Sequence, residues 1–170
     1  MALPRKIKNF NLFNEGNSFI GEIPEATLPK LTRKTEEYRA GGMNGPIDLD
    51  YGMEALQFDW TMAGYNRILL AQWGTLRHDG VLLRFAGALQ ADDDTAAHSL
   101  EVVMRGRHKE IDFGTAKAGD ATAIKVQSKL SYYKLTMDNE PIIEIDLVNM
   151  IENIGGTDLL ASVRSALGLA

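Results

Sequence analysis

Residues 55–63 read Ala-Leu-Gln-Phe-Asp-Trp-Thr-Met-Ala, a run in which apolar and polar residues alternate. Its even-numbered positions hold Leu, Phe, Trp and Met, whereas Gln57, Asp59 and Thr61 lie between them. Because successive side chains of a strand point to opposite faces, the alternation puts the apolar residues on one face and the polar residues on the other. The stretch is therefore predicted to be a half-buried β-strand with one polar face.

Similar alternation recurs along the chain. Residues 81–90 continue it, with Gly87 at one apolar-face position. Residues 98–113 begin apolar and become basic at 105–109, so their far end is expected to leave the core. A basic strand end of this kind is interpreted as a source of ion pairs between subunits.

The stretch from 121 to 137 also alternates, but its apolar residues change phase part of the way along. A phase change inside one long strand indicates a bulge or bend, here near Ser131. Residues 138–141, Asp-Asn-Glu-Pro, favour a tight reversal, and apolar residues return in 142–148. The two stretches are predicted to form a hairpin.

Shorter signals complete the outline. A hairpin is expected around Asn14-Glu15-Gly16-Asn17, and residues 26–39 are predicted to be one extended, largely polar strand. Helices are expected over 65–73, ending at Gly74, and after a Thr157 cap at the C-terminus. The prediction is a mainly β protein, with residues 1–170 forming one domain: an antiparallel β-sandwich or partly open barrel with one or two short helices.

A glycine-rich and proline-containing segment interrupts two extended regions, and it is predicted to project from the domain as a loop at about 40–46. Its apolar Met43 would have nothing to bury against within one subunit, so this loop is the candidate arm that reaches a neighbouring subunit. The candidate interface residues are Arg39, Gly41, Gly42, Met43, Asn44, Gly45 and Pro46.

Composition excludes several classes of protein. Apolar residues make up 45% and charged residues 24%, as in ordinary globular proteins. A net charge of -5 argues against a protein that grips nucleic acid, because phosphate binding needs an excess of Lys and Arg. The chain contains no cysteine, which excludes disulfides and thiolate metal sites. No stretch approaches the roughly 20 apolar residues that cross a bilayer, so membrane insertion is not expected.

No group of residues in the sequence indicates a catalytic, phosphate-binding or metal-binding site. The three histidines occupy separate segments without metal-ligand spacing and are expected at surfaces or strand ends, and Asp92-Asp93-Asp94 is typical of a solvated loop. Gly41-Gly42 precedes Pro46 and not the Lys-Ser/Thr ending of a phosphate-binding loop. We therefore expect no catalytic residues, no cofactor and no metal.

Several blocks resemble one known family. Leu28-Pro29-Lys30-Leu31, the block 37–43 (Glu-Tyr-Arg-Ala-Gly-Gly-Met), Ser131-Tyr132-Tyr133-Lys134, Glu144-Ile145-Asp146 and the C-terminal helix of 156–169 occur in the expected order. Together they resemble the major tail tube protein of contractile-tailed phages, the family that also supplies the tube of R-type pyocins. The resemblance spans nearly the whole chain and is weakest over residues 63–97.

This resemblance implies a fold related to the type VI secretion tube, with six subunits in a ring and rings stacked head to tail inside a sheath. It implies self-assembly, contacts with sheath, tape measure, baseplate and terminator proteins, and a place in the virion tail after assembly in the bacterial cytoplasm. DNA would pass through the lumen without specific binding, and Gln57, Asp59 and Thr61 are candidates to line that lumen by analogy.

Three other interpretations stay open. A DNA-free tailocin or a type VI secretion-like apparatus would use the same subunit fold. An enzyme on a β-sandwich would need titratable residues clustered in a pocket, and a small-ligand barrel would need an apolar interior cavity in a monomer.

Overall fold

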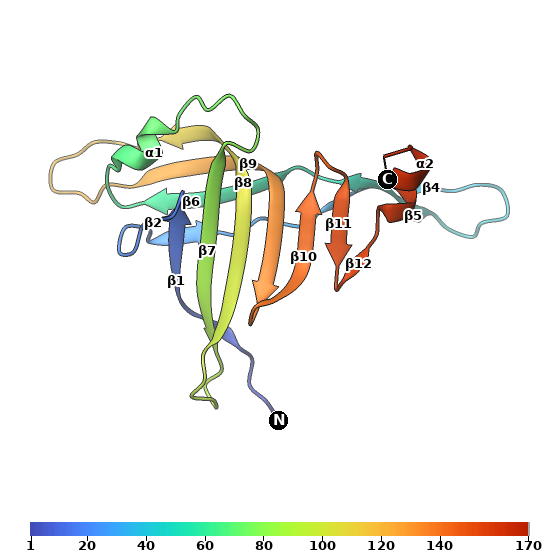
Figure 1. Cartoon of the computed structure of the whole chain (residues 1–170), viewed down its shortest axis with the longest axis horizontal. Helices are drawn as coiled ribbons and strands as arrows, with labels where there is room; N and C mark the ends of the chain where they lie inside the picture. Colours follow the sequence, from blue (N-terminus) through green and yellow to red (C-terminus); the bar gives the residue numbers. More distant parts are fainter. Residues whose placement is uncertain (170) are drawn as a thin grey trace.

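Strands build nearly all of the regular structure, which a computed structural model describes for residues 1–169 (Figure 1). The strands are β1 (Lys6–Asn14), β2 (Asn17–Ser18), β3 (Glu25–Thr27), β4 (Arg33–Tyr38), β5 (Ile47–Met53), β6 (Leu56–Met62), β7 (Val81–Gln90), β8 (His98–Asp112), β9 (Ile124–Met137), β10 (Glu140–Asp146), β11 (Ile151–Ile154) and β12 (Thr157–Asp158). The helices are α1 (Arg67–Ala71) and α2 (Ala161–Ala166). The predicted mainly β fold with short helices is confirmed.

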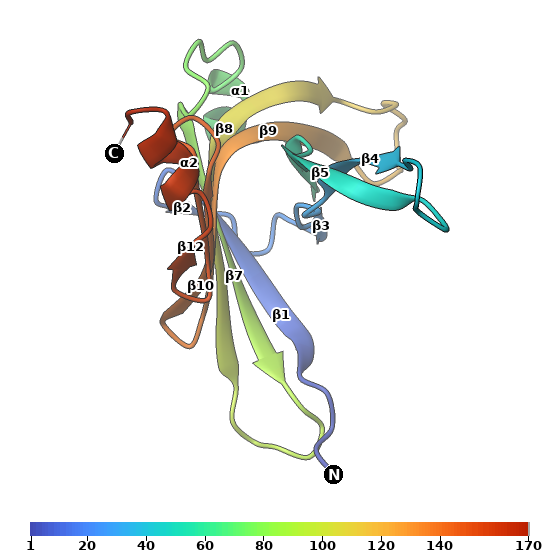
Figure 2. The same cartoon turned by 90° about the vertical axis from the view of Figure 1, so that its right-hand side faces the viewer.

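Two layers of antiparallel strands face each other. The first layer has the order β2-β1-β7-β8-β9-β10-β11-β12, and the second consists of β3, β6, the first half of β9 and the last part of β8. In Figure 1 β6 crosses behind β7 and β8 at a steep angle, and Figure 2 shows β8 and β9 bending from one layer into the other. Such crossed packing needs strands that change layers at bulges or bends.

β9 makes that change at Ser131. Arg105 of β8 pairs with Tyr132 and the next residue, Gly106, pairs with Leu130, so Ser131 is the extra residue of a β-bulge. Before the bulge β9 pairs with β6, and after it β9 pairs with β10. The buried positions shift phase at this point, as predicted for the stretch 121–137.

The core lies between the layers. The apolar face of β6 is completely buried, and the apolar faces of β7 and β8 meet it, as the alternation in 55–63 predicts. Gly106 lies where the two layers diverge. A Cβ at this position would lie 2.0 Å from the carbonyl oxygen of Lys129. Only glycine lets β8 bend this closely over β9. The largest fully buried side chains are Trp60, Phe19, Phe58, Leu12, Leu56 and Met62.

The far end of β8 corrects an expectation. Gly106 and His108 remain buried, and Ile111 still packs against the core. The predicted departure of residues 105–113 from the core is wrong because α1 covers this end of the strand and Gln72, which follows the helix, supplies a hydrogen-bond partner to His108. For the same reason His108 is not the surface histidine expected from sequence.

Other boundaries also differ from the predictions. The single strand expected over 26–39 is two strands, β3 and β4, and Thr157 lies in β12 while Leu160 is the N-cap residue of α2. The predicted turns are confirmed: Asp138 and Asn139 have φ of 48° and 64° in the β9–β10 hairpin. Within residues 1–169, no helix combines the length and apolar character needed to cross a membrane.

Candidate functional site: a polar sheet face and a projecting arm

The outer face of the second layer carries three rows of polar side chains. Strand pairing places Gln57 beside Lys129 and Arg107, Asp59 beside Gln127 and Glu110, and Thr61 beside Lys125 and Asp112. β3 extends the last two rows with Thr27 and Glu25. Three basic and four acidic residues therefore alternate over this face, which leaves it close to neutral. This polar face is defined by Glu25, Thr27, Gln57, Asp59, Thr61, Arg107, Glu110, Asp112, Lys125, Gln127 and Lys129.

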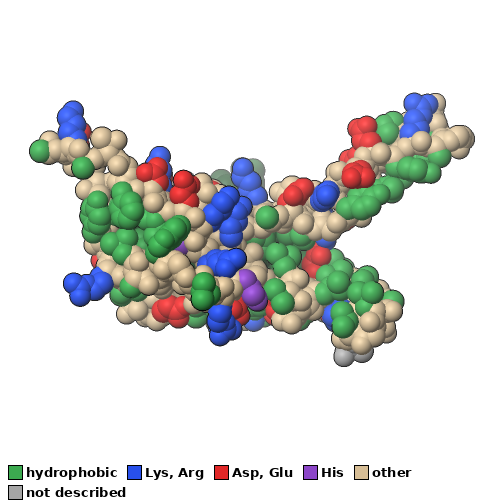
Figure 3. Space-filling view, turned by 90° about the horizontal axis from the view of Figure 1, so that it is seen from above, with side chains coloured by type: hydrophobic (Ala, Val, Ile, Leu, Met, Phe, Trp, Pro, Cys, Tyr) green, Lys and Arg blue, Asp and Glu red, His purple; other side chains and the backbone are tan. Residues whose placement is uncertain are grey.

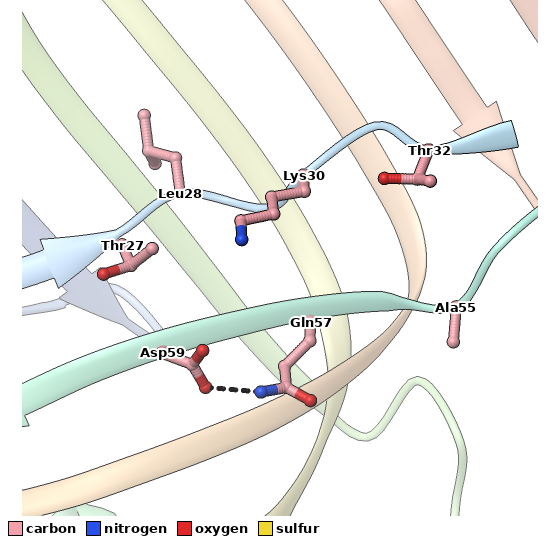
Figure 4. A pocket seen from close by; sticks show the side chains of 7 residues that line it. All are labelled: Thr27, Leu28, Lys30, Thr32, Ala55, Gln57 and Asp59. Carbon is pink, nitrogen blue, oxygen red and sulfur yellow. Dashed lines mark hydrogen bonds between the residues drawn. The ribbon is translucent and has the colours of Figure 1, made fainter.

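Gln57 and Asp59 lie at the centre of this face. They are half-buried, and the Gln57 amide donates a hydrogen bond of 2.7 Å to the Asp59 carboxylate. Figure 4 shows both beside a shallow cavity of about 250 Å³ between β6 and the segment 28–32, from which Lys30 extends toward β6. Thr61 is different: it is only 7% exposed, and its hydroxyl donates to Glu25 of β3.

Both edges of the second layer lack a backbone partner among residues 1–169. β3 pairs only with β6. On the opposite edge, the pairing of β7 with β8 ends at Gly106, so residues 107–112 of β8 pair with β9 alone. An unpaired strand edge is a template for pairing with another chain.

The β4–β5 hairpin forms an arm that stands away from both layers (Figure 1). Its two strands make a separate two-stranded sheet, and every residue of β4 is exposed. The loop 39–46 forms the tip; Gly42 adopts φ of 86°, and Met43 is half-buried against its own turn, where its sulfur accepts from the Ala40 amide. A two-stranded hairpin with so little support is marginally stable by itself.

One ion pair ties the arm to the first layer. Arg33 of β4 donates two hydrogen bonds to the carboxylate of Glu152 in β11, and its Nε lies 3.5 Å from Asp50 of β5. The Glu152 carboxylate is buried, whereas the Arg33 guanidinium is partly open to water. The bidentate contact fixes the direction in which the arm leaves the body.

A buried chain of hydrogen bonds fixes α1. Trp60 donates to the Ser128 hydroxyl, which lies 2.9 Å from His108 Nδ1. His108 Nε2 lies 2.9 Å from the side-chain oxygen Oε1 of Gln72, which follows α1. Gln72 in turn exchanges two hydrogen bonds with Asn14. A carbonyl partner at Nε2 requires a proton there, so Nδ1 accepts from the serine and the ring is neutral. Burial lowers the pKa of His108 to about 4.

The predicted residues thus occupy two separate places. Gln57, Asp59 and Thr61 lie on the polar face, and the loop residues lie at the tip of the arm. Sequence reasoning missed the contributions of β8 and β9 to the polar face, although odd-numbered polar positions in 125–129 carried the same alternation. Residues 1–169 contain no group of three or more His, Asp or Glu side chains placed to hold a metal ion.

The fold is that of contractile injection systems. The chain superimposes with a TM-score of 0.60 on a PVC sheath/tube terminator, covering 78% of this chain and 96% of that one, at 10% identity. A chain of the PVC sheath-tube complex gives 0.58 over 78% and 91%. The tube-terminating cap of the anti-feeding prophage gives 0.58 over 80% and 94%. These structures show a shared architecture.

Sequence comparison defines the family more narrowly. Residues 4–168 match the family described as phage tail tube protein FII. The chain is 44% identical to the tail tube protein of Escherichia phage P2 over 99% of its length and 100% of that protein. It is 41% identical to the major tail tube protein of Serratia phage KSP20, with 99% of both covered. The chain belongs to the phage tail tube protein FII family, whose members are structural components of the virion tail.

Proposed function

We propose that this chain is the repeating subunit of the inner tube of a contractile phage tail. Copies close into hexameric rings, the rings stack head to tail, and the lumen conducts DNA and the tape measure protein during ejection. The observation that carries this proposal is the polar face: a nearly neutral sheet surface bounded on both sides by unpaired strand edges.

The edges explain lateral closure. Residues 107–112 of β8 and residues 25–27 of β3 lie at opposite sides of the second layer, so one copy can offer β8 to the β3 edge of the next. A contact between two different surfaces closes into a ring when its rotation divides a full turn. A closed barrel also removes the exposed edges that would otherwise aggregate.

The charge of the polar face suits a conduit. Each lysine or arginine that contacts phosphate releases counterions and strengthens binding, so a basic lining would retain DNA. Here the basic Arg107, Lys125 and Lys129 are interspersed with acidic neighbours in adjacent rows. Gln57 and Asp59 at the centre of the face offer DNA no excess of positive charge, which supports passage without specific binding.

The solved structures support the choice of partners. They come from a sheath/tube terminator, a sheath-tube complex and a tube-terminating cap. We infer by similarity that this subunit contacts a sheath protein and a terminator in the virion, together with a baseplate, after assembly in the bacterial cytoplasm.

Electron microscopy of the purified protein tests the assembly. Stacked rings with a central channel are expected, and a compact monomer at high concentration would refute the proposal. Replacing residues 41–46 by a two-residue Asn-Gly turn should leave a folded protein that no longer stacks, because the arm tip is the candidate contact with a neighbouring ring. Shortening the exposed loop 115–121 before β9 by four residues is the matched control, because it removes the same length of chain outside the candidate interface. Stacking by the shortened variant would remove the loop from assembly.

Lysine substitution tests the assignment of Asp59 to the lumen. Asp59→Lys should leave the tube assembled but make it retain short duplex DNA, with log affinity falling against log salt by an additional slope of roughly 0.9 per new contact. Glu140→Lys, at the exposed first residue of β10, is the control for added charge outside the second layer. Equal DNA retention by the two assembled variants would contradict the assignment of Asp59 to the lumen.

The similarity to injection-system components also supports an alternative, a tube of a DNA-free tailocin or type VI secretion-like apparatus. The DNA content of purified particles distinguishes the two: packaged heads attached to the tails support the phage tail, and tails without DNA support the alternative.

A further inference from the structure

One end of the molecule carries an apolar knob. α1 buries only Leu69, and the apolar side chains around it face outward: Trp73 is 57% and Leu76 is 91% exposed. Tyr65 stacks on Phe113 at 6.0 Å between ring centroids. Figure 3 shows the resulting apolar surface over α1, away from the arm. The α1 knob is defined by Tyr65, Ile68, Leu70, Trp73, Leu76, Ile111 and Phe113.

Apart from Ile111, which also packs against the core, these side chains leave much of their apolar area in water. Leu70, Trp73, Ile111 and Phe113 line an open cavity of about 490 Å³ whose walls are mostly apolar. Leaving such a surface in water forfeits about 25 cal/mol for each Å² of apolar area that another surface could cover. Contiguous apolar surface on a soluble protein is typical of an interaction site.

The opposite end carries an apolar notch. Register places Tyr38, Ile47, Leu49 and Tyr51 on one face of the arm, and Ile47 and Tyr51 are 52% and 58% exposed. Beyond a register shift, Met53 pairs with Arg33 and lines a cavity of about 240 Å³ together with Leu160 and Val163 at α2. Figure 3 shows the arm and α2 diverging on either side of this hollow, with apolar side chains on both. The notch is defined by Tyr38, Ile47, Leu49, Tyr51, Met53, Leu159, Leu160, Val163 and Leu167.

The two ends also carry opposite charge. The arm, residues 33–54, contains five acidic and three basic residues, whereas residues 64–80 around α1 contain two arginines and one aspartate. Arg67 on α1 and Glu36 on the apolar face of the arm form no ion pair within residues 1–169. A second copy of the chain therefore offers the notch a partner that matches it in both apolar character and charge.

We propose that the α1 knob of one copy inserts into the notch between the arm and α2 of another copy. This inference rests on the proposed tube function and identifies the surface that receives the arm. Knob and notch lie at opposite ends of the long axis (Figure 1). The knob of one subunit therefore cannot reach its own notch, and the contact propagates from copy to copy. Docking covers the apolar face of a hairpin that is marginally stable when isolated.

Cysteine cross-linking tests the contact, because the chain has no cysteine of its own. Leu76→Cys places one thiol on the knob, and Val163→Cys places another in the notch on α2; both positions are exposed. The two variants are prepared separately, mixed, assembled and treated with a short bis-maleimide. A cross-linked pair between the two variants is expected, at a yield at least tenfold above that of Leu76→Cys mixed with the Asp93→Cys control in the loop before β8.

Each outcome bears on the proposal. Assembled tubes in which the Leu76→Cys and Val163→Cys variants form no mixed cross-link refute knob-into-notch docking and leave the tube function standing. Cross-linking of the Leu76→Cys variant with itself, without the mixed pair, refutes docking because it shows like surfaces meeting. Absence of rings and tubes from the unsubstituted protein under the same conditions refutes the tube as well. A cross-link that forms in tubes and is lost when Trp73→Ala is added supports docking through the knob.

Discussion

Acidification should destabilise the folded subunit through His108. Its Nε2 faces the side-chain oxygen of Gln72 and its Nδ1 faces the hydroxyl of Ser128, so a second proton finds no anionic partner there. The ring is only 7% exposed. Burial lowers its pKa from 6.5 to about 4, which means that the folded chain resists a proton that the unfolded chain accepts.

The size of the effect follows from that pKa difference. One pKa unit corresponds to about 1.4 kcal/mol, so the difference corresponds to about 3 kcal/mol in total. Between pH 6.5 and about pH 4 the unfolded state binds the extra proton, and the free energy of unfolding falls by about 1.4 kcal/mol per pH unit as the pH falls. Below about pH 4 the folded state also takes the proton, and this residue adds no further loss.

Urea unfolding at a series of pH values measures the effect, with dilute, unassembled protein and tryptophan fluorescence as the signal. Trp60 lies 6.1 Å from His108 between ring centroids and belongs to the same hydrogen-bond chain, so it reports on this site. His108→Gln is the comparison because its amide can still donate to Gln72 but does not titrate. The stability of the native sequence should fall more steeply than that of the variant between pH 6.5 and about 4. Parallel pH profiles of the two proteins would refute the buried, neutral histidine.

Two further predictions concern stability. Glu152→Gln should lower the free energy of unfolding by about 1–2 kcal/mol, because it removes the buried carboxylate partner of Arg33 and leaves only the exposed Asp50 beside a guanidinium that water screens. Urea unfolding measures the loss. Tryptic cleavage in the arm should also become faster, and an unchanged cleavage rate would contradict the role of the Arg33–Glu152 pair. Gly106→Ala should cost about 3 kcal/mol or more, because the new Cβ would meet the carbonyl oxygen of Lys129. Gly45→Ala, with nothing within 4 Å of the new Cβ, should stay within about 0.5 kcal/mol in the same thermal melts, and equal losses for the two would contradict the close approach of β8 to β9.

The layers of this fold could be predicted because alternation is a local signal. β6 and β7 follow it residue by residue, and even the bulge at Ser131 appeared as a change of phase. The burial of the far half of β8 could not be predicted from alternation. Its buried side is made of Gly106 and His108, which look like surface or turn residues until α1 is folded over them.

The candidate surfaces were predictable only in part. Gln57 and Asp59 indicated a polar face because they alternate with large apolar residues, but the neighbours that make the face neutral come from strands far away in sequence. Register between β6, β8 and β9 brings them together, and register depends on the bulges. The knob could not be predicted for another reason: the apolar residues of a short helix look the same whether they face a core or another subunit.

The bulge in β9 gives the subunit a mechanical property. Two layers joined only by side-chain packing can shear past each other when a load acts on one of them. Here β9 runs through both layers, so a load applied to the β10 side travels through consecutive peptide bonds to the β6 side. Separating the layers would require breaking backbone hydrogen bonds on both sides of Ser131, so the two layers resist sliding as one body.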